Sequence, residues 1–132
     1  TAVGRRPFSA DLGLEMTSVK IDQNGFIETD VQCKTEHNNI YAIGDVAGNP
    51  MLAHKATAEA RIAVESIQGM SSIFDPAAIP AIVFTDPEIA WAGLTETQAK
   101  SKGIAVDTIS FPWIASGRAM TVGHTDDSQS WW

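Results

Sequence analysis

The feature of this sequence that most limits its fold is a short apolar run, Ile40-Tyr41-Ala42-Ile43, which stops at Gly44-Asp45. The run has no polar alternation, which is typical of a strand covered on both faces, as in an α/β sheet. Ligands of open α/β sheets bind at the carboxyl ends of the strands, where Gly44 and Asp45 would lie. Glycine lets a ligand approach the backbone, and a carboxylate accepts strong hydrogen bonds from a polyol. Residue types alone favour the alternative, an ordinary polar turn after a strand.

A helix is predicted directly after this turn, over about 50–68. Asn49 is a suitable N-cap, Pro50 suits the first helical position, and Gly69 is typical of the position just beyond a helix. The N–H groups at the start of such a helix favour an anion or a polarised carbonyl. The predicted apolar stripe consists mostly of small residues that would pack closely against a sheet: Ala56, Ala60, Ala63, Val64 and Ile67.

The flanking regions indicate a second type of structure. Asn24-Gly25 between β-type residues predicts a hairpin over about 18–29, and residues 70–78 form the best internal boundary. Beyond that boundary, adjacent strands with an inserted helix indicate an antiparallel α+β unit. The helix starts at a capping box, Thr95 to Gln98. The elements predicted there are strands over 79–84, 89–92 and 104–111, a helix over 96–102, and a fourth strand from about Ser116.

Composition excludes several classes of function. The 132 residues carry 44% hydrophobic and 19% charged side chains, as a modest globular domain does. A net charge of -7 without a local basic run argues against binding to nucleic acid or anionic lipid. No apolar stretch approaches the roughly 20 residues that a membrane helix needs. The single cysteine, Cys33, excludes an internal disulfide, favours a reducing compartment, and is expected to be a structural thiol in a strand. The three histidines lack the spacing of a metal site.

Several segments resemble one family of flavoproteins. Thr35, six further residues and then Ala42-Ile43-Gly44-Asp45 resemble the second FAD-binding fingerprint of the pyridine nucleotide-disulfide oxidoreductases, which have two dinucleotide-binding domains. Pro50-Met51-Leu52-Ala53-His54-Lys55-Ala56 is similar to the helix start of the dihydrolipoamide dehydrogenase branch in particular. Further similarity lies in three segments: Val3–Pro7 with the end of the NAD-binding domain, and Phe84–Thr95 and Phe111–Ala119 with the dimer-interface domain.

The resemblance implies a fold of α/β plus α+β character, in which the end of the two-dinucleotide-domain FAD/NAD fold precedes the start of the antiparallel interface domain. It implies that Asp45 hydrogen-bonds the ribityl chain of FAD. Met51, Leu52, Ala53 and His54 would pass beside the flavin, and Gly4 would lie beside NAD. The implied domains are the end of the NAD-binding domain over 1–18, the second FAD-binding segment over 19–75, the start of the interface domain over 76–126, and a non-native or disordered tail over 127–132.

Parts that the family uses for catalysis are missing from this sequence. It has no CxxxxC dithiol, no GxGxxG motif and no catalytic His-Glu pair, so we expect an internal fragment that is inactive and binds little or no FAD alone. The family implies FAD and NAD as cofactors, dihydrolipoamide as substrate, a homodimer, and 2-oxo acid dehydrogenase complexes as partners in the cytoplasm or mitochondrial matrix. Alternatives are a non-catalytic self-association or partner-binding fragment and another flavoprotein disulfide reductase.

Overall fold

The structure is a computed structural model that describes residues 3–85, 88–109, 111, 112, 117, 121, 130 and 131. The chain divides into two compact units, Thr1–Pro76 and Ala77–Trp132. The boundary expected from the sequence was the connector 70–78. Each unit is described by itself below.

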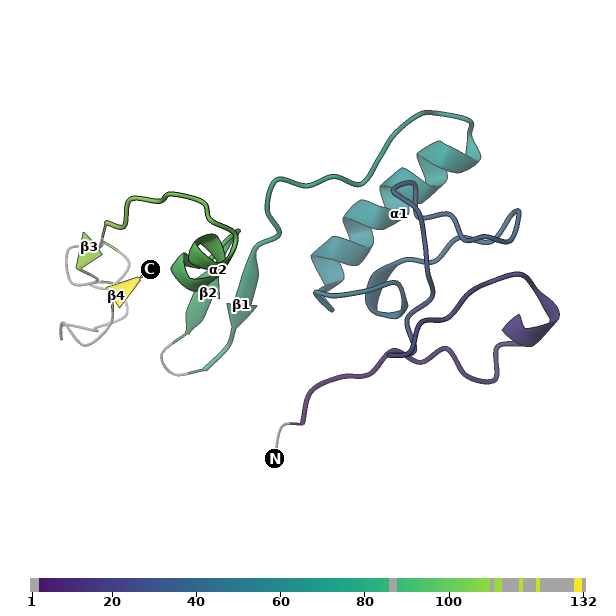
Figure 1. Cartoon of the computed structure of the whole chain (residues 1–132), viewed down its shortest axis with the longest axis horizontal. Helices are drawn as coiled ribbons and strands as arrows, with labels where there is room; N and C mark the ends of the chain where they lie inside the picture. The colour runs from purple at the N-terminus through teal and green to yellow at the C-terminus, as the bar shows by residue number, and fades with distance from the viewer. Residues whose placement is uncertain are drawn as a thin grey trace. The chain divides into compact units, whose positions relative to one another are not determined.

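Unit 1 contains one long helix and a set of ordered loops (Figure 1). The helix α1 spans Ala53–Ile67, and two short 3₁₀ helices precede it: η1 over Leu14–Met16 and η2 over Gly44–Val46. α1 packs directly against η2, so the turn that follows the apolar run lies beside the helix. This contact places the candidate site of unit 1.

The apolar run before η2 was predicted to be a strand, and that prediction is wrong for the described residues. Tyr41 forms a single antiparallel bridge with Lys34, and no longer ladder includes Ile40 or Ile43. A strand is defined by the ladder it shares with a neighbour, so an extended segment with one bridge stays outside a sheet. Cys33, expected in a strand, adopts a left-handed turn conformation at φ 62°.

The hairpin predicted over 18–29 is present in reduced form. Ile21 and Ile27 form one antiparallel bridge, and the Glu28 N–H donates to the Lys20 carbonyl at 2.9 Å. The turn between them relies on the Asp22 carboxylate, which accepts the backbone N–H groups of Asn24 and Phe26 at 2.8 and 2.9 Å. These bonds hold the pKa of Asp22 below its ordinary value, with the Phe26 N–H as the largest cause.

Helix α1 begins later than the sequence predicted. Its N-cap is Leu52, without a side-chain cap, so neither Asn49 nor Pro50 has the predicted capping role. The predicted end is confirmed. Gly69 is left-handed at φ 81°, and its N–H donates to the Ser66 carbonyl while the Met70 N–H donates to the Glu65 carbonyl, which is the Schellman arrangement.

The predicted stripe of α1 is only partly the buried face. Ala63 is buried, but Val64 and Ile67 are exposed. Lys55 and Glu59 are buried instead, and together with Ala63 they follow one another at intervals of four residues along α1. The buried face of α1 was predicted wrongly because it contains the charged residues Lys55 and Glu59, and a prediction made from apolar residues alone leaves both out.

Unit 2 contains short antiparallel pairs and one short helix. The two strands predicted over 79–84 and 89–92 are present as β1 over Ala81–Val83 and β2 over Ile89–Trp91. They pair antiparallel, with Ile82 opposite Ala90. The helix α2 spans Glu96–Ser101 and starts with the predicted capping box, in which the Thr95 side chain accepts the Gln98 N–H at 3.2 Å. Gly103 follows α2 in a left-handed conformation.

The later part of unit 2 differs from the prediction. Residues 104–109 form no strand. Among the residues described after them, Phe111–Pro112 forms β3, which pairs with β4 over Ser130–Trp131. β4 lies within the segment for which a non-native or disordered tail was expected. The fourth strand expected from Ser116 falls largely outside the described residues, and Gly117, which is described, is helical.

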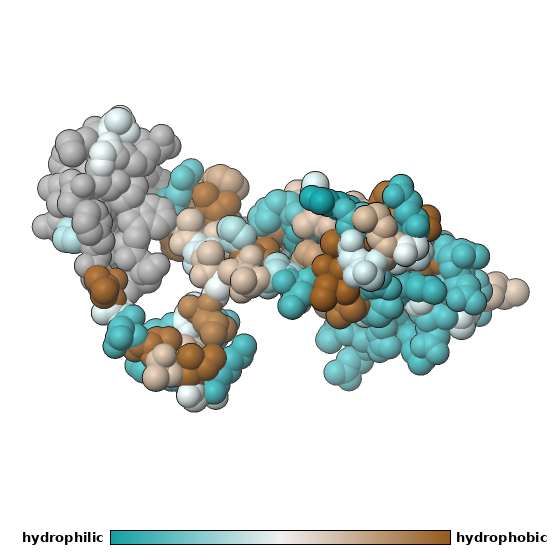
Figure 2. Space-filling view, turned by 90° about the horizontal axis from the view of Figure 1, so that it is seen from above, coloured by the Kyte–Doolittle hydropathy of each residue, from teal (hydrophilic) through white to brown (hydrophobic). Residues whose placement is uncertain are grey.

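The core consists of small side chains, and much apolar surface is exposed. The buried hydrophobic residues are Ile27, Cys33, Ala42, Ala63 and Ala99. Figure 2 shows apolar side chains on the surface among hydrophilic ones. The exposed residues of unit 2 include Phe84, Ile89 and Ile109. In the described part of the chain, no helix is long and apolar enough to span a lipid bilayer.

Candidate functional site

The candidate site is built around the turn η2, in which Asp45 follows Gly44. Gly44 has φ 73°, a conformation that side chains disfavour, and a Cβ there would lie 3.1 Å from the Cβ of Ala56 in α1. The Val46 carbonyl accepts the Ile27 N–H at 2.8 Å, which ties the turn to the hairpin. Glycine at this position therefore allows the turn, which contains Asp45, to lie this close to α1.

A buried ion pair in α1 holds the backbone of Gly44. Lys55 Nζ lies 2.7 Å from Glu59 Oε1, and the two side chains are only 4% and 8% exposed. Glu59 Oε2 accepts the Gly44 N–H at 2.7 Å, and Lys55 Nζ donates to the Gly44 carbonyl at 3.3 Å. Sequence reasoning missed both residues; their signal is a Lys and a Glu at i, i+4 spacing on the same face as the small alanines.

The single thiol lies behind this pair. Cys33 is buried, and its Sγ donates to the Glu59 carbonyl at 3.7 Å. Burial raises the pKa of the Cys33 thiol, and the nearby Glu59 charge raises it further. A thiol in this environment stays protonated near neutral pH, which makes it a poor nucleophile and a structural group.

Arg5 connects three segments that the sequence analysis assigned to the site. Its Nη1 donates to the Met51 carbonyl at 3.0 Å and lies 3.8 Å from Asp45 Oδ2. Arg5 and Asp45 are largely exposed, at 70% and 50% of their side-chain surface. The structure thus brings the N-terminal loop, Asp45 and the approach to α1 together. Gly4 has φ 86°, and no atom lies within 4 Å of the place its Cβ would occupy.

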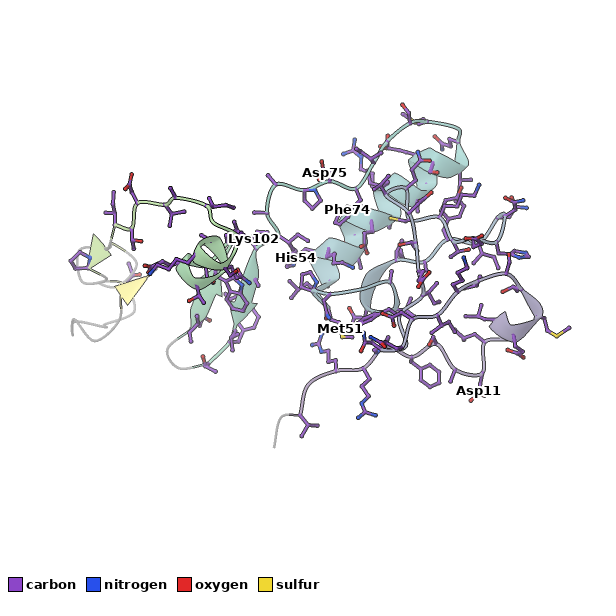
Figure 3. All side chains as sticks on the ribbon, viewed as in Figure 1. Asp11, Met51, His54, Phe74, Asp75 and Lys102 are labelled. Atoms are coloured by element: carbon purple, nitrogen blue, oxygen red, sulfur yellow. The ribbon has the colours of Figure 1, made fainter. Side chains whose placement is uncertain are left out.

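The start of α1 has the positive polarity of a helix N-terminus. No side chain caps the helix, and its first turn contains no acidic residue. The N-terminus of a helix is equivalent to about half a positive charge, so it favours an anion. Figure 3 shows Met51 and His54 at the beginning of α1, where Met51 and Leu52 are half-buried while Ala53 and His54 are exposed.

A polar cleft of about 570 Å³ lies between the N-terminal loop and the approach to α1. Arg5, Arg6 and Met51 line it together with Asn24 and Asn49. A second cavity of about 560 Å³ lies in unit 2, lined mainly by residues 91–97 and 106–109. The second cavity contains none of the predicted site residues, so the cleft beside Met51 is the one relevant to the candidate site.

The arrangement provides binding groups rather than reactive ones. It offers a half-exposed carboxylate, a guanidinium and a helix N-terminus, which suit a ligand with hydroxyl groups and a developing negative charge. Within the described ranges, no group of three or more His, Cys, Asp or Glu side chains is placed to hold a metal ion. The described thiol is the buried one of Cys33.

Two family models match the chain. Residues 1–60 match pyridine nucleotide-disulphide oxidoreductase. Residues 79–128 match the pyridine nucleotide-disulphide oxidoreductase dimerisation domain. The two matches fall on opposite sides of the division between unit 1 and unit 2.

Curated relatives are about 50% identical to the chain over the aligned residues. Dihydrolipoyl dehydrogenase of Buchnera aphidicola subsp. Schizaphis graminum is 52% identical over 118 residues, which are 89% of this chain and 25% of that protein. Dihydrolipoyl dehydrogenase of Geobacillus stearothermophilus is 50% identical over 124 residues, which are 94% of this chain and 26% of that protein. The chain therefore spans about a quarter of the length of these relatives.

Solved structures of similar proteins superpose well on the chain. The HOCl-induced flavoprotein disulfide reductase RclA from Escherichia coli matches with a TM-score of 0.81 and 28% identity, over 94% of this chain and 29% of RclA. LpdA from Mycobacterium tuberculosis matches with a TM-score of 0.79 and 30% identity, over 92% of this chain and 27% of LpdA.

Proposed function

Because the chain belongs to the pyridine nucleotide-disulphide oxidoreductase family, we propose that it forms the second FAD-binding segment and the start of the dimer interface of a dihydrolipoamide dehydrogenase. The identity to two dihydrolipoyl dehydrogenases, 52% and 50%, supports this branch over another flavoprotein disulfide reductase. In this proposal residues 1–18 end the NAD-binding domain, 19–75 form the FAD segment, and 76–126 begin the interface domain.

One observation carries the FAD assignment: hydrogen bonds hold the turn η2, which contains Asp45, beside the uncapped start of α1, and we call this arrangement the corner. The buried Lys55–Glu59 pair hydrogen-bonds both backbone polar groups of Gly44. On the exposed side, Arg5 hydrogen-bonds the Met51 carbonyl and forms an ion pair with Asp45. The donor set fits a flavin with a polyol chain, because a carboxylate accepts hydroxyl hydrogen bonds and a helix N-terminus stabilises negative charge.

The residues then have separate tasks. Asp45 would accept hydrogen bonds from the ribityl hydroxyls of FAD. The backbone N–H groups of Met51, Leu52, Ala53 and His54 would stabilise negative charge on the flavin. Gly4, open on its Cα side, leaves room for NAD. When bound, FAD supplies the chemistry of passing electrons between a dithiol and NAD⁺.

The complete activity needs groups that this sequence does not encode. Its single cysteine cannot form a redox dithiol, so electron transfer from dihydrolipoamide requires a CxxxxC pair from elsewhere in the protein. We propose that the 132-residue chain alone is inactive and retains FAD weakly. The match of residues 79–128 to a dimerisation domain supports a homodimer, and the family branch supports service to 2-oxo acid dehydrogenase complexes.

The test uses a chimera in which this chain replaces the matching segment of the Geobacillus stearothermophilus enzyme, to which it is 50% identical. Asp45→Ala should weaken FAD binding by about tenfold to a hundredfold, because a hydrogen bond to a charged group contributes about 1.5–3 kcal/mol. Glu15→Ala, which removes an exposed carboxylate in η1, is the matched control and should leave FAD binding unchanged. Equal FAD retention in the Asp45→Ala and control chimeras would refute the assignment.

A further inference from the structure

Three residues of α1 surround Gly44 on different sides. Glu59 accepts its N–H at 2.7 Å, Lys55 donates to its carbonyl at 3.3 Å, and the Ala56 Cβ stands 3.1 Å from where a Gly44 Cβ would be. Both backbone polar groups and the Cα of one residue are therefore fixed by a single helix. Asp45 is covalently attached to this residue.

Stability alone is a weak reason for such a pair. Desolvation of two charges offsets much of their attraction, and apolar side chains of similar volume often replace a buried ion pair without loss of stability. The distinctive result of Lys55 and Glu59 is geometric. They leave two hydrogen-bonding groups, one donor and one acceptor, aimed at the backbone of the turn.

We propose that Lys55 and Glu59 are positioning residues that set the distance between Asp45 and the start of α1. The inference rests on the proposed FAD site, because both ends of that distance contact the flavin there. Lys55 lies in the first turn of α1 and Glu59 lies one turn later. Their hydrogen bonds therefore fix the position of the turn η2 relative to the start of α1. The pair does not contact the ligand; it acts through Gly44.

The test compares two double variants in the same chimera. Lys55→Gln with Glu59→Gln removes the ion pair but keeps an amide donor for the Gly44 carbonyl and an amide oxygen to accept the Gly44 N–H. Lys55→Met with Glu59→Leu removes the ion pair and the acceptor. If positioning is the role, the Gln variant keeps FAD binding within about threefold of the parent chimera, and the Leu variant binds roughly tenfold more weakly, as expected for a lost hydrogen bond of about 1.4 kcal/mol.

A second readout is the reduction potential of the bound flavin in FAD-saturated protein. A loosened corner stabilises the reduced, negatively charged flavin less, so the potential of the Leu variant shifts to more negative values while that of the Gln variant does not. The control replaces the exposed pair Glu96–Lys100, which has the same i, i+4 spacing in α2, by Gln at both positions. It should change neither FAD affinity nor potential.

Equal FAD affinity and equal potential in the two double variants would overturn the inference. If Asp45→Ala lowers FAD retention while the Leu variant does not, the positioning role fails and the FAD assignment stands; if neither lowers it, the FAD assignment fails. A further measurement is the hydrogen exchange rate of the Gly44 amide in the unsubstituted chain, which does not depend on the folding of any variant. Strong protection is expected, and exchange at the rate of an unstructured peptide would overturn the proposed grip.

Discussion

Gly44→Ala is the sharpest perturbation of the corner between η2 and α1. The residue has φ 73°, and the added methyl group would lie 3.1 Å from the Cβ of Ala56, closer than ordinary van der Waals contact. A non-glycine residue in the left-handed region costs about 1–2 kcal/mol. Overpacking against a neighbour costs a further 1–3 kcal/mol or so. We therefore expect unit 1 to lose about 2–5 kcal/mol of its free energy of unfolding.

Gly69→Ala separates the two contributions. Gly69 has φ 81°, close to that of Gly44, but no atom lies within 4 Å of its Cβ position. This variant should therefore show the backbone term alone, about 1–2 kcal/mol. The difference between the two variants measures the contact with Ala56.

The assay is urea unfolding of the 132-residue chain followed by far-ultraviolet circular dichroism. Among the helices with described bounds, α1 provides 15 residues and α2 provides 6, so loss of the α1 signal is the readout for unit 1. The slope of free energy against urea should match in all variants, so that midpoint shifts report stability. If Gly44→Ala destabilises the chain no more than Gly69→Ala does, the close packing of η2 on α1 is refuted.

Three other expectations concern single side chains. Arg5→Gln should change stability by less than about 1 kcal/mol, as thermal unfolding will show, because its ion pair with Asp45 is exposed. Cys33 should react slowly with iodoacetamide in folded protein, because it is buried. Burial also raises the pKa of its thiol, so the contribution of Cys33 to stability is present below the ordinary thiol pKa and is lost as the pH rises above that value. Asp22 has a lowered pKa, so its contribution is lost as pH falls through the folded value; acid titration of Asp22→Asn should show a weaker dependence on pH.

The predictions that the structure confirms depend on residues close together in sequence. The capping box from Thr95 to Gln98 and the left-handed Gly69 after α1 are set by local hydrogen bonds. The strand expected at 40–43 needs a neighbouring ladder, which a pattern of apolar residues does not identify, and one bridge from Tyr41 is what forms. The start of α1 was misplaced because Asn49 and Pro50 fit capping statistics, whereas the helix begins at Ala53 after an N-cap, Leu52, that has no capping side chain.

The candidate site was predictable in its exposed part and missed in its buried part. Asp45 was assigned through the resemblance of residues 35–45 to an FAD-binding fingerprint, because residue types alone favoured an ordinary turn. Lys55 and Glu59 were missed because charged residues on a helix are normally assigned to the solvent face. A Lys and a Glu four residues apart, in register with Ala63 and following a Gly-Asp turn, are the signal that would have identified them.

The same locality explains why the corner of the proposed FAD site forms within this chain. Every group that grips Gly44 belongs to the stretch between the turn and the second turn of α1, and the most distant partner, Glu59, is 15 residues away. A sheet joins segments at larger separations, so its strands depend on partners outside this stretch, while the turn and the helix hold each other. Asp45 and the start of α1 can therefore take their positions before the rest of a flavin site surrounds them. In the chimera, the effect of Lys55 and Glu59 on FAD should accordingly be one of geometry within a preformed corner.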